Sequence, residues 1–293
     1  MSANSQQLLE RKIQTAGQLD SIVSTMKALA ATSLYQYEHA VDSLTRYDQT
    51  VELGFQILLR ARPDLLARSQ GFAKTGKAII VVGSDQGLCG ALNERLIESV
   101  VQELQSDDQS VVASLAIGHR LEARLSNRIT VEHTLPAPRS PERVTDLVQE
   151  ALSQIESWQS SHAISHIDLF FNQYLSGTSW KPVRKALLPF DMCWLQQLAK
   201  KKWSTRMLPT FTLPVKDLSI ALTREHLFVS LSRSFTESLA SAHAARLLAM
   251  QAAQKGIEER LEELQRLFHQ ARQSRVTDEL LEVVSGAEVL SSE

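Results

Sequence analysis

Apolar residues recur every three or four positions at both ends of the chain, which is the spacing of one face of a helix. Residues 8–62 contain no proline and only two glycines, and a single helix of about 50 residues would be about 75 Å long. A helix of that length needs a partner along it, because packing supplies most of its stability. The seam is Ala16, Leu19, Val23, Met26, Ala30, Leu34, Tyr37, Val41 and Leu44.

The same pattern returns in residues 217–285, which contain no proline and one glycine. We expect Asp217 and Ser219 to cap the start of this helix and Ser285-Gly286 to end it. Gly256 lies inside the pattern, where a glycine indicates close contact with another helix. The seam is Phe235, Leu239, Ala242, Ala245, Ala249, Ala253, Ile257, Leu261, Leu264, Phe268 and Ala271.

Between the two ends the period changes to alternating strands and helices, which is typical of a mostly parallel α/β sheet. Ser140 is expected to cap a helix that opens at Pro141. The predicted strands are 78–83, 110–118, 128–134, 166–175 and an edge strand 180–190; the predicted helices are 88–104, 119–125 and 140–158. The predicted fold class is α/β plus long helices: an antiparallel coiled coil of segments 1–62 and 217–293 with an inserted Rossmann-like α/β domain, 77–208.

The stretch GSDQGLCGALN (83–93) follows a strand and opens a helix, as a phosphate-binding loop does. Its glycines do not have the G-x-G-x-x-G spacing, and it contains no lysine or arginine. Asp85 would repel phosphate and is expected to cap the next helix. The segment GFAKTGKA (71–78) also resembles a phosphate loop, but it precedes its strand and lacks the Ser or Thr ligand for magnesium. A tight packing turn is favoured; the alternative, a nucleotide-binding α/β enzyme using loop 83–90, remains open.

Composition adds no chemistry to this pattern. The formal charge of -2 gives no electrostatic reason to expect nucleic acid or an anionic membrane surface as partner. No apolar run is long enough to span a membrane. Cys89, Cys193 and the eight histidines lack the spacing of a metal or catalytic site, so no catalytic, cofactor-binding or metal residue is predicted. The basic run 200–202 with Arg206 is either a solvated turn or a docking patch for an acidic partner.

Three motifs carry a specific resemblance. GSDQGLCGALN is similar to the SDRGLCG-G-LN signature of the γ subunit of rotary F-type (F1Fo) ATP synthases, bacterial type. ESLASAHAARLLAMQAA (237–253) and ARQSRVTDELLEVVSGAEVL (271–290) resemble the last helix of that family. KIQTAGQLDSIVSTMKALAATSL (12–34) resembles its first helix more loosely.

The resemblance implies a central rotor shaft that couples H⁺ or Na⁺ flow to ATP synthesis or hydrolysis on other subunits. The implied partners are the α3β3 hexamer of F1, the ε subunit and the c-ring of Fo. No catalytic site and no cofactor belong to such a chain. It is expected to lie peripherally at the cytoplasmic face of a bacterial inner membrane, without a span of its own. A coiled-coil scaffold with no ATPase partner is a further alternative.

Individual residues follow from the same resemblance. The implied contacts with the β subunit are Met26, Lys27, Arg272, Gln273 and Thr277. The implied domain turn and docking residues are Gly83, Asp85, Gly87, Cys89 and Gly90. The chain departs from the family at Ser21, Ser24 and Ser33, where basic residues are usual, and at Gly256, where Asn is expected. These departures leave open whether the chain is the standard subunit or a divergent paralogue.

Overall fold

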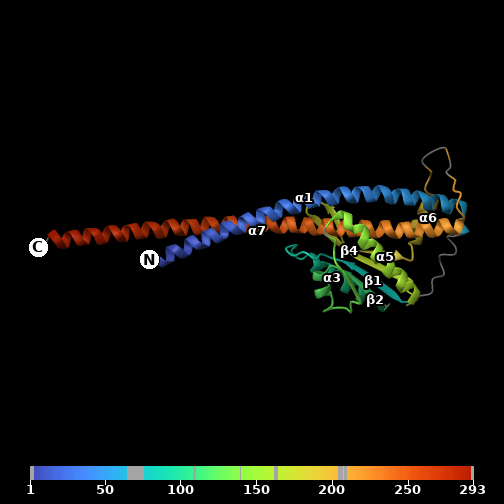
Figure 1. The fold of residues 1–293 in the computed structure, drawn as a ribbon, viewed down its shortest axis with the longest axis horizontal. Coiled ribbons are helices and arrows are strands. Elements are labelled where there is room, and N and C mark those ends of the chain that lie inside the picture. Colours follow the sequence, from blue (N-terminus) through green and yellow to red (C-terminus); the bar gives the residue numbers. More distant parts are fainter. Residues whose placement is uncertain are drawn as a thin grey trace. The chain divides into compact units, whose positions relative to one another are not determined.

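The computed structural model describes residues 3–64, 76–107, 110–138, 140–161, 164–203, 207 and 210–291. Most of segment 71–78 and Arg206 of the basic run lie outside these residues. The chain divides into two compact units, Met1–Ala30 with Leu247–Glu293 and Ala31–Arg246. Two long helices, α1 (Ala3–Ala61) and α7 (Val215–Ser291), contribute to both units (Figure 1).

In the first unit, α1 and α7 pack antiparallel. The ammonium group of Lys27 donates to Gln254 Oε1 at 2.9 Å, and Arg275 Nη1 donates to Gln6 Oε1 at 3.4 Å. The later residue of α1 thus pairs with the earlier residue of α7, as it does when two helices run in opposite directions. Leu264 and Ala271 of the predicted seam are buried. The antiparallel pairing predicted for the two ends is therefore confirmed here.

Two details of that seam were predicted wrongly. Leu19 is 49% exposed, and Asp20 faces inward in its place. The Oδ1 atom of Asp20 is buried and has no hydrogen bond within the described residues. The 3.6-residue period of a straight helix drifts from a seven-residue repeat, and the seam shifts by one position. Gly256 makes no close helix contact, because a Cβ atom added there would meet nothing within 4 Å.

The ends of α7 also differ from the prediction. The helix begins at Val215, so Asp217 and Ser219 lie within its first turns, and the Ser219 hydroxyl donates to the Lys216 carbonyl instead of capping the helix. It continues past Ser285-Gly286 to Ser291. One glycine costs a helix only about 1 kcal/mol relative to alanine, which the helix-forming residues on both sides can offset.

In the second unit, the α1–α7 pairing continues beside a five-stranded sheet. The rings of Tyr37 and His243 stack with centroids 5.3 Å apart, and the Tyr47 hydroxyl donates to Glu225 at 2.6 Å. The sheet has the order β3-β2-β1-β4-β5. All neighbours are parallel except β4 and β5. The predicted mostly parallel sheet and its edge strand are thus confirmed. The strands are β1 (Lys77–Val82), β2 (Val111–Ile117), β3 (His133–Leu135), β4 (His166–Ser176) and β5 (Ser179–Leu188).

Strand β3 is shorter than the predicted segment 128–134. The Ser114 hydroxyl donates to the Thr130 carbonyl at 2.7 Å and accepts from the Glu132 N–H at 3.0 Å. These two bonds satisfy backbone groups that a longer β3 would pair with β2. Ile129 and Val131 pack against the core from this irregular segment instead.

Short helices complete the second unit: α3 (Leu92–Gln105), α4 (His119–Leu125), the 3-10 turn η2 (Pro141–Arg143), α5 (Val144–Ser161) and α6 (Met192–Lys200). One face of the sheet forms a core with α3 and α4, made of Ile79, Val81, Leu96, Ile97, Val100, Ala116, Leu121, Leu125 and Phe170. The Ser140 side chain makes no cap hydrogen bond, in contrast to the prediction. Helix α6 lies in a stretch for which no helix was predicted.

Candidate functional site

Loop 83–90 lies at the carboxyl end of β1, where α/β proteins bind ligands. Three of its backbone donors are used within the protein. The Gly83 N–H bonds to the Ile117 carbonyl at 2.9 Å, the Ser84 N–H to Asn93 Oδ1 at 3.1 Å, and the Gln86 N–H to the Ser84 hydroxyl at 3.2 Å. A phosphate-binding loop needs such N–H groups pointing at its ligand. The first two of these donors instead fasten the loop to β2 and α3, and the third closes the loop on itself.

Contrary to the expectation from the sequence, Asp85 does not cap α3. The N-cap position of α3 is Ala91, which makes no side-chain hydrogen bond. The two carboxylate oxygens of Asp85 accept from the His119 N–H at the start of α4 and, at 3.0 Å, from the Ala137 N–H. Asp85 therefore joins three segments that are distant in sequence, which local propensity could not reveal.

The glycines of the loop serve close packing and an unusual backbone. A Cβ atom on Gly83 would lie 2.7 Å from Leu121, which confirms the close contact expected of this turn. A Cβ atom on Gly87 would overlap the Arg120 guanidinium. Gly90 has φ +56°, and its neighbour Leu88 has φ +64° with 55% of the residue exposed. A leucine in this left-handed conformation is strained.

Arg246 of α7 connects the loop to the long helix. It is 6% exposed, and its partners are the Cys89 sulfur at 3.1 Å, the Gly87 carbonyl at 3.4 Å and His243 Nδ1 at 3.1 Å. Burial, followed by the Arg246 charge, lowers the pKa of His243 to about 4. The cavity between loop and helix holds only about 20 Å³. Ligand pockets span about 300–1,000 Å³, so this geometry disfavours the nucleotide-binding alternative.

Hydrogen bonds also fasten both long helices to the sheet. The Ser238 hydroxyl of α7 donates to the Val82 carbonyl at the end of β1 at 2.9 Å, and Ser241 donates to the Asn172 carbonyl of β4 at 2.8 Å. The Tyr174 hydroxyl donates to Glu38 of α1; burial and then this bond raise the pKa of Tyr174 to about 12. Displacing the sheet against α7 would break two buried hydrogen bonds, and displacing it against α1 would break a partly buried one.

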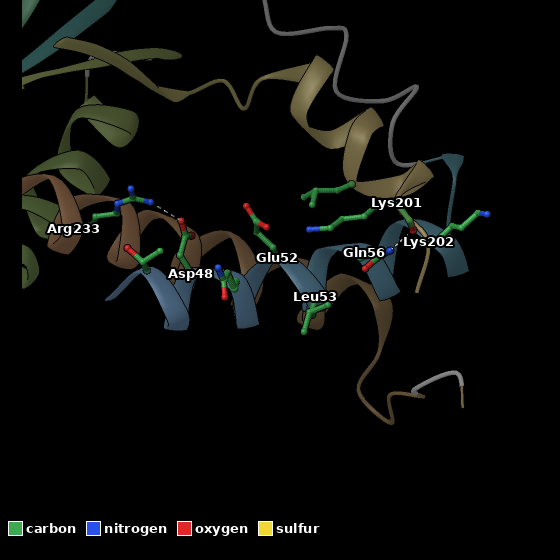
Figure 2. Close-up of a pocket in the computed structure, with 10 residues that line it drawn as sticks. Asp48, Glu52, Leu53, Gln56, Lys201, Lys202 and Arg233 are labelled. Carbon is green, nitrogen blue, oxygen red and sulfur yellow. Dashed lines mark hydrogen bonds and ion pairs between the residues drawn. The ribbon is translucent and has the colours of Figure 1, made fainter. Parts of the chain in front are cut away.

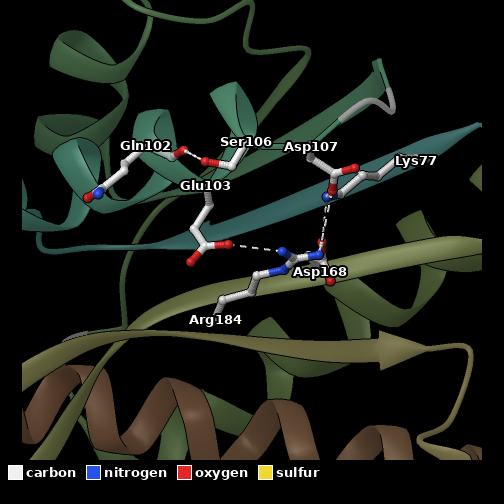
Figure 3. A network of polar contacts seen from close by, with 7 residues as sticks. All are labelled: Lys77, Gln102, Glu103, Ser106, Asp107, Asp168 and Arg184. Atoms are coloured by element: carbon white, nitrogen blue, oxygen red, sulfur yellow. Dashed lines mark hydrogen bonds and ion pairs between the residues drawn. The ribbon is translucent and has the colours of Figure 1, made fainter.

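A buried ionic network lies at the opposite, amino end of β1 (Figure 3). Lys77, 2% exposed, pairs with Asp107 at 2.6 Å and Asp168 at 2.7 Å. Arg184 of β5 joins Asp168 at 2.9 Å and Glu103 at 3.0 Å. Lys77, the second lysine of the phosphate-loop-like segment 71–78, is thus an internal ion-pair partner of Asp168, and Arg184 extends the network from β4 to β5.

A cleft of about 440 Å³ lies beside the last turns of α1 (Figure 2). Asp48 and Glu52 of α1 line one side of this cleft, and Lys201 and Lys202 follow α6 on the other. In Figure 2 the Lys201 side chain extends toward Glu52, whereas the Lys202 side chain points away. Both acidic and basic groups line the cleft, so its charge favours no single class of ligand.

The residues matched to the β-subunit contacts all lie in the first unit. Met26 is half-buried in the helix seam, and Lys27 is held by Gln254. Arg272 and Gln273 are exposed, and their side chains make no hydrogen bond or ion pair within the described residues. The hydroxyl of Thr277 donates to the Gln273 carbonyl one turn earlier at 3.0 Å.

Sequence reasoning missed Arg246, Asn93 and the Lys77–Asp168 pair. The pair carried a signal, because an acid inside the apolar strand HIDLFF indicates a buried partner. Arg246 carried none, because an arginine in a helix pattern usually faces solvent. In the parts of the chain that the structure describes, no cluster of three metal-ligating side chains occurs. Over the same residues, no helix meets the length and hydropathy of a membrane span.

Comparison with known proteins agrees along almost the whole chain. A family model described as ATP synthase matches residues 5–290. An ATP synthase gamma chain of Pasteurella multocida is 26% identical over 289 residues, covering 95% of this chain and 97% of the relative. One of Buchnera aphidicola is 25% identical, covering 94% and 97%.

Solved structures agree on the fold. A rotor chain of Euglena gracilis mitochondrial ATP synthase has a TM-score of 0.63 at 15% identity, covering 94% of this chain and 100% of that chain. A chain of the central stalk and c-ring structure of Tetrahymena thermophila mitochondrial ATP synthase has a TM-score of 0.58 at 17% identity, covering 79% and 99%.

Two paired long terminal helices that carry an inserted, mostly parallel α/β sheet define the class of protein: a two-helix coiled coil with an α/β insert. The full-length family match specifies the class further. The chain belongs to the ATP synthase gamma chain family, the non-catalytic central-stalk subunit of the F-type ATP synthase.

Proposed function

We propose that this chain is the rotor shaft that couples H⁺ or Na⁺ flow through a c-ring to ATP synthesis or hydrolysis on the β subunits of an α3β3 hexamer. In this proposal, segments 1–62 and 217–293 form the shaft, and segment 77–208 forms the docking domain at its base. The observation that carries the proposal is the fastening of the sheet to both long helices by Tyr174, Ser238 and Ser241, since a shaft must not slip on its base.

The contacts with β are proposed at Met26, Lys27, Arg272, Gln273 and Thr277. Arg272 and Gln273 support this best, because their exposed polar groups remain available to another chain. A shaft that contacts three β subunits differently biases their conformational equilibria, and the coupling is reciprocal. Lys27 supports the proposal less well, because its ammonium group already donates to Gln254 within the helix pair.

The base is proposed to dock on ε and the c-ring. The relatives from Tetrahymena and Euglena come from structures described as containing a central stalk or F1 together with a c-ring. Loop 83–90, with Gly83, Asp85, Gly87, Cys89 and Gly90, is proposed to hold a rigid docking turn that exposes Leu88. The protein would then lie peripherally at the cytoplasmic face of a bacterial inner membrane.

Co-expression with α and β tests the assignment. The shaft function predicts recovery of one copy of this chain per α3β3 hexamer. A scaffold without ATPase partners would instead associate with itself, and recovery of this chain free of α and β would contradict our proposal. A nucleotide-binding enzyme would show thermal stabilisation by ATP, ADP or NAD in the isolated chain, where we expect none.

A double substitution tests the β contacts. Arg272→Ala with Gln273→Ala should weaken ATP-driven rotation or coupled ion pumping and leave assembly largely intact. The matched control is Gln265→Ala with Arg266→Ala, a pair of the same two exposed residue types on the same helix. Equal coupling in the two double variants would remove Arg272 and Gln273 from the contact surface.

A further inference from the structure

Helix α6 packs on both long helices within the second unit, at the end of α1 (Figure 1). It follows the edge strand β5 after a three-residue connection, 189–191. The cluster that holds it consists of Val51, Phe55 and Leu59 of α1, Leu195 and Leu198 of α6, and Val229 of α7. The coiled coil is therefore locally a bundle of three helices, and we call α6 with these turns of α1 and α7 the three-helix foot.

An aromatic cluster fixes α6 against sideways movement. The indole of Trp194 stacks on the ring of His226 of α7 with centroids 4.7 Å apart and an interplanar angle of 29°. Phe55 of α1 meets the same indole edge-on at 5.7 Å, and Phe190 meets it at 6.4 Å. Such aromatic pairs have a preferred geometry and so resist sliding more than aliphatic contacts do.

Two side chains of α1 hold the carboxyl end of α6. Gln56, 2% exposed, donates through Nε2 to the Lys201 carbonyl, the C-cap of α6 (Figure 2). Arg60 Nη2 donates to the same oxygen at 2.7 Å. At the other end Asp191 caps α6 by accepting the Cys193 N–H at 2.8 Å. Water could satisfy an exposed terminal carbonyl, so two donors from another helix serve to attach α6 rather than to cap it.

We propose that Gln56 and Arg60 are positioning residues that clamp α6 as a load-bearing brace between the edge of the sheet and the shaft. The proposal rests on the rotor function proposed above. Two helices in a coiled coil can slide past each other under torsion, whereas a third helix packed on both opposes that shift. Because β5 runs directly into α6, force on the sheet reaches α1 and α7 through this clamp as well as through the hydrogen bonds of the sheet.

The test compares torsional stiffness in the assembled ATPase complex. Gln56→Leu with Arg60→Met removes both donors and keeps apolar bulk. An ATP analogue that resists hydrolysis arrests the α3β3 hexamer in one state. A probe attached to the inserted domain, 77–208, then reports the range of angles over which this domain fluctuates. We expect a loss of stiffness, seen as a wider spread, with an unchanged rate of ATP hydrolysis when the rotor turns without load.

Two further variants sharpen the result. Lys202→Met also removes a cation from this cleft, but the Lys202 side chain points away from Gln56 (Figure 2). The angular spread measured for this variant should therefore equal that of the wild type. Arg60→Lys restores one donor and should recover part of the stiffness. If the double variant does not assemble, Arg60→Met alone gives the comparison, because Arg60 is exposed.

The outcomes are distinguishable. A wider spread in the clamp variants with normal hydrolysis supports the brace. A spread equal to that of the wild type overturns it and leaves the rotor function standing. A wild-type complex whose probe never rotates with ATP overturns the rotor function itself, together with the brace that rests on it.

Discussion

Acid should destabilise this protein through His226 in the three-helix foot. Its side chain is 14% exposed and lies among Phe55, Phe190 and Trp194. Burial first, and then the charge of Lys185, lower the pKa of His226 from 6.5 to about 4, although Asp48 acts in the opposite direction. The folded protein therefore holds this imidazole neutral over a pH range in which the unfolded chain binds a proton.

The sign and the size follow from this difference. Well above pH 6.5 the imidazole is neutral in both states, so the contribution of the histidine is constant. As the pH falls from 6.5 toward 4, the unfolded state is stabilised by protonation and the free energy of unfolding decreases. At about 1.4 kcal/mol per pKa unit, the full loss from this one side chain is about 3 kcal/mol.

Urea unfolding of the full chain, followed by tryptophan fluorescence from about pH 7.5 to about pH 4.5, measures this loss. His226→Phe keeps an aromatic ring in the cluster and removes the titrating group, so its stability should fall less steeply with acid. His269→Phe makes the same substitution at an exposed histidine of the same helix and serves as the control for the change of side chain itself. A His226→Phe variant that loses stability as steeply as the wild type would refute the reasoning.

Two comparisons of stability in urea test the packing described above. Gly83→Ala should lower the free energy of unfolding by about 1–3 kcal/mol, because its Cβ would lie 2.7 Å from Leu121. In Gly256→Ala the new Cβ meets nothing within 4 Å, so this variant should be more stable by about 1 kcal/mol. Equal effects of the two substitutions would contradict the contacts assigned to Gly83. Lys77→Met should destabilise the chain by about 3–5 kcal/mol, because it leaves the buried Asp168 with less compensation. Adding Asp168→Leu should recover much of that loss, and no recovery would show that the pair is not the cause.

The long-range architecture could be predicted because it follows from periodicity. A three- or four-residue repeat without proline specifies a long helix whatever it packs on, and the alternation of strands and helices specifies a parallel sheet. The failures occur where a tertiary partner decides the outcome. Strand β3 is short because Ser114 satisfies the backbone at Thr130, and Leu19 is exposed because the helix seam drifts to Asp20.

Helix α6 is a different kind of failure, because its signals were present in the sequence. Asp191 is a good N-cap, and Leu195 and Leu198 are spaced to face one side. The segment follows an edge strand and Pro189, and such short apolar runs are ambiguous from the pattern alone. Its clamp could not have been predicted, since Gln56 and Arg60 lie more than a hundred residues earlier in the chain and have the composition of an ordinary helix surface.

Loop 83–90 shows why a glycine-rich turn after a strand does not by itself indicate a ligand. Glycine is required wherever two backbones or a backbone and a side chain approach closely, and a phosphate is only one reason for that approach. Here the space beside Gly83 is filled by Leu121, the Ser84 N–H is taken by Asn93, and a buried Arg246 reaches in from α7. The Arg246 contacts that disfavour a nucleotide here also fasten the loop to a long helix, which a transmitting shaft requires and a freely opening active site would avoid.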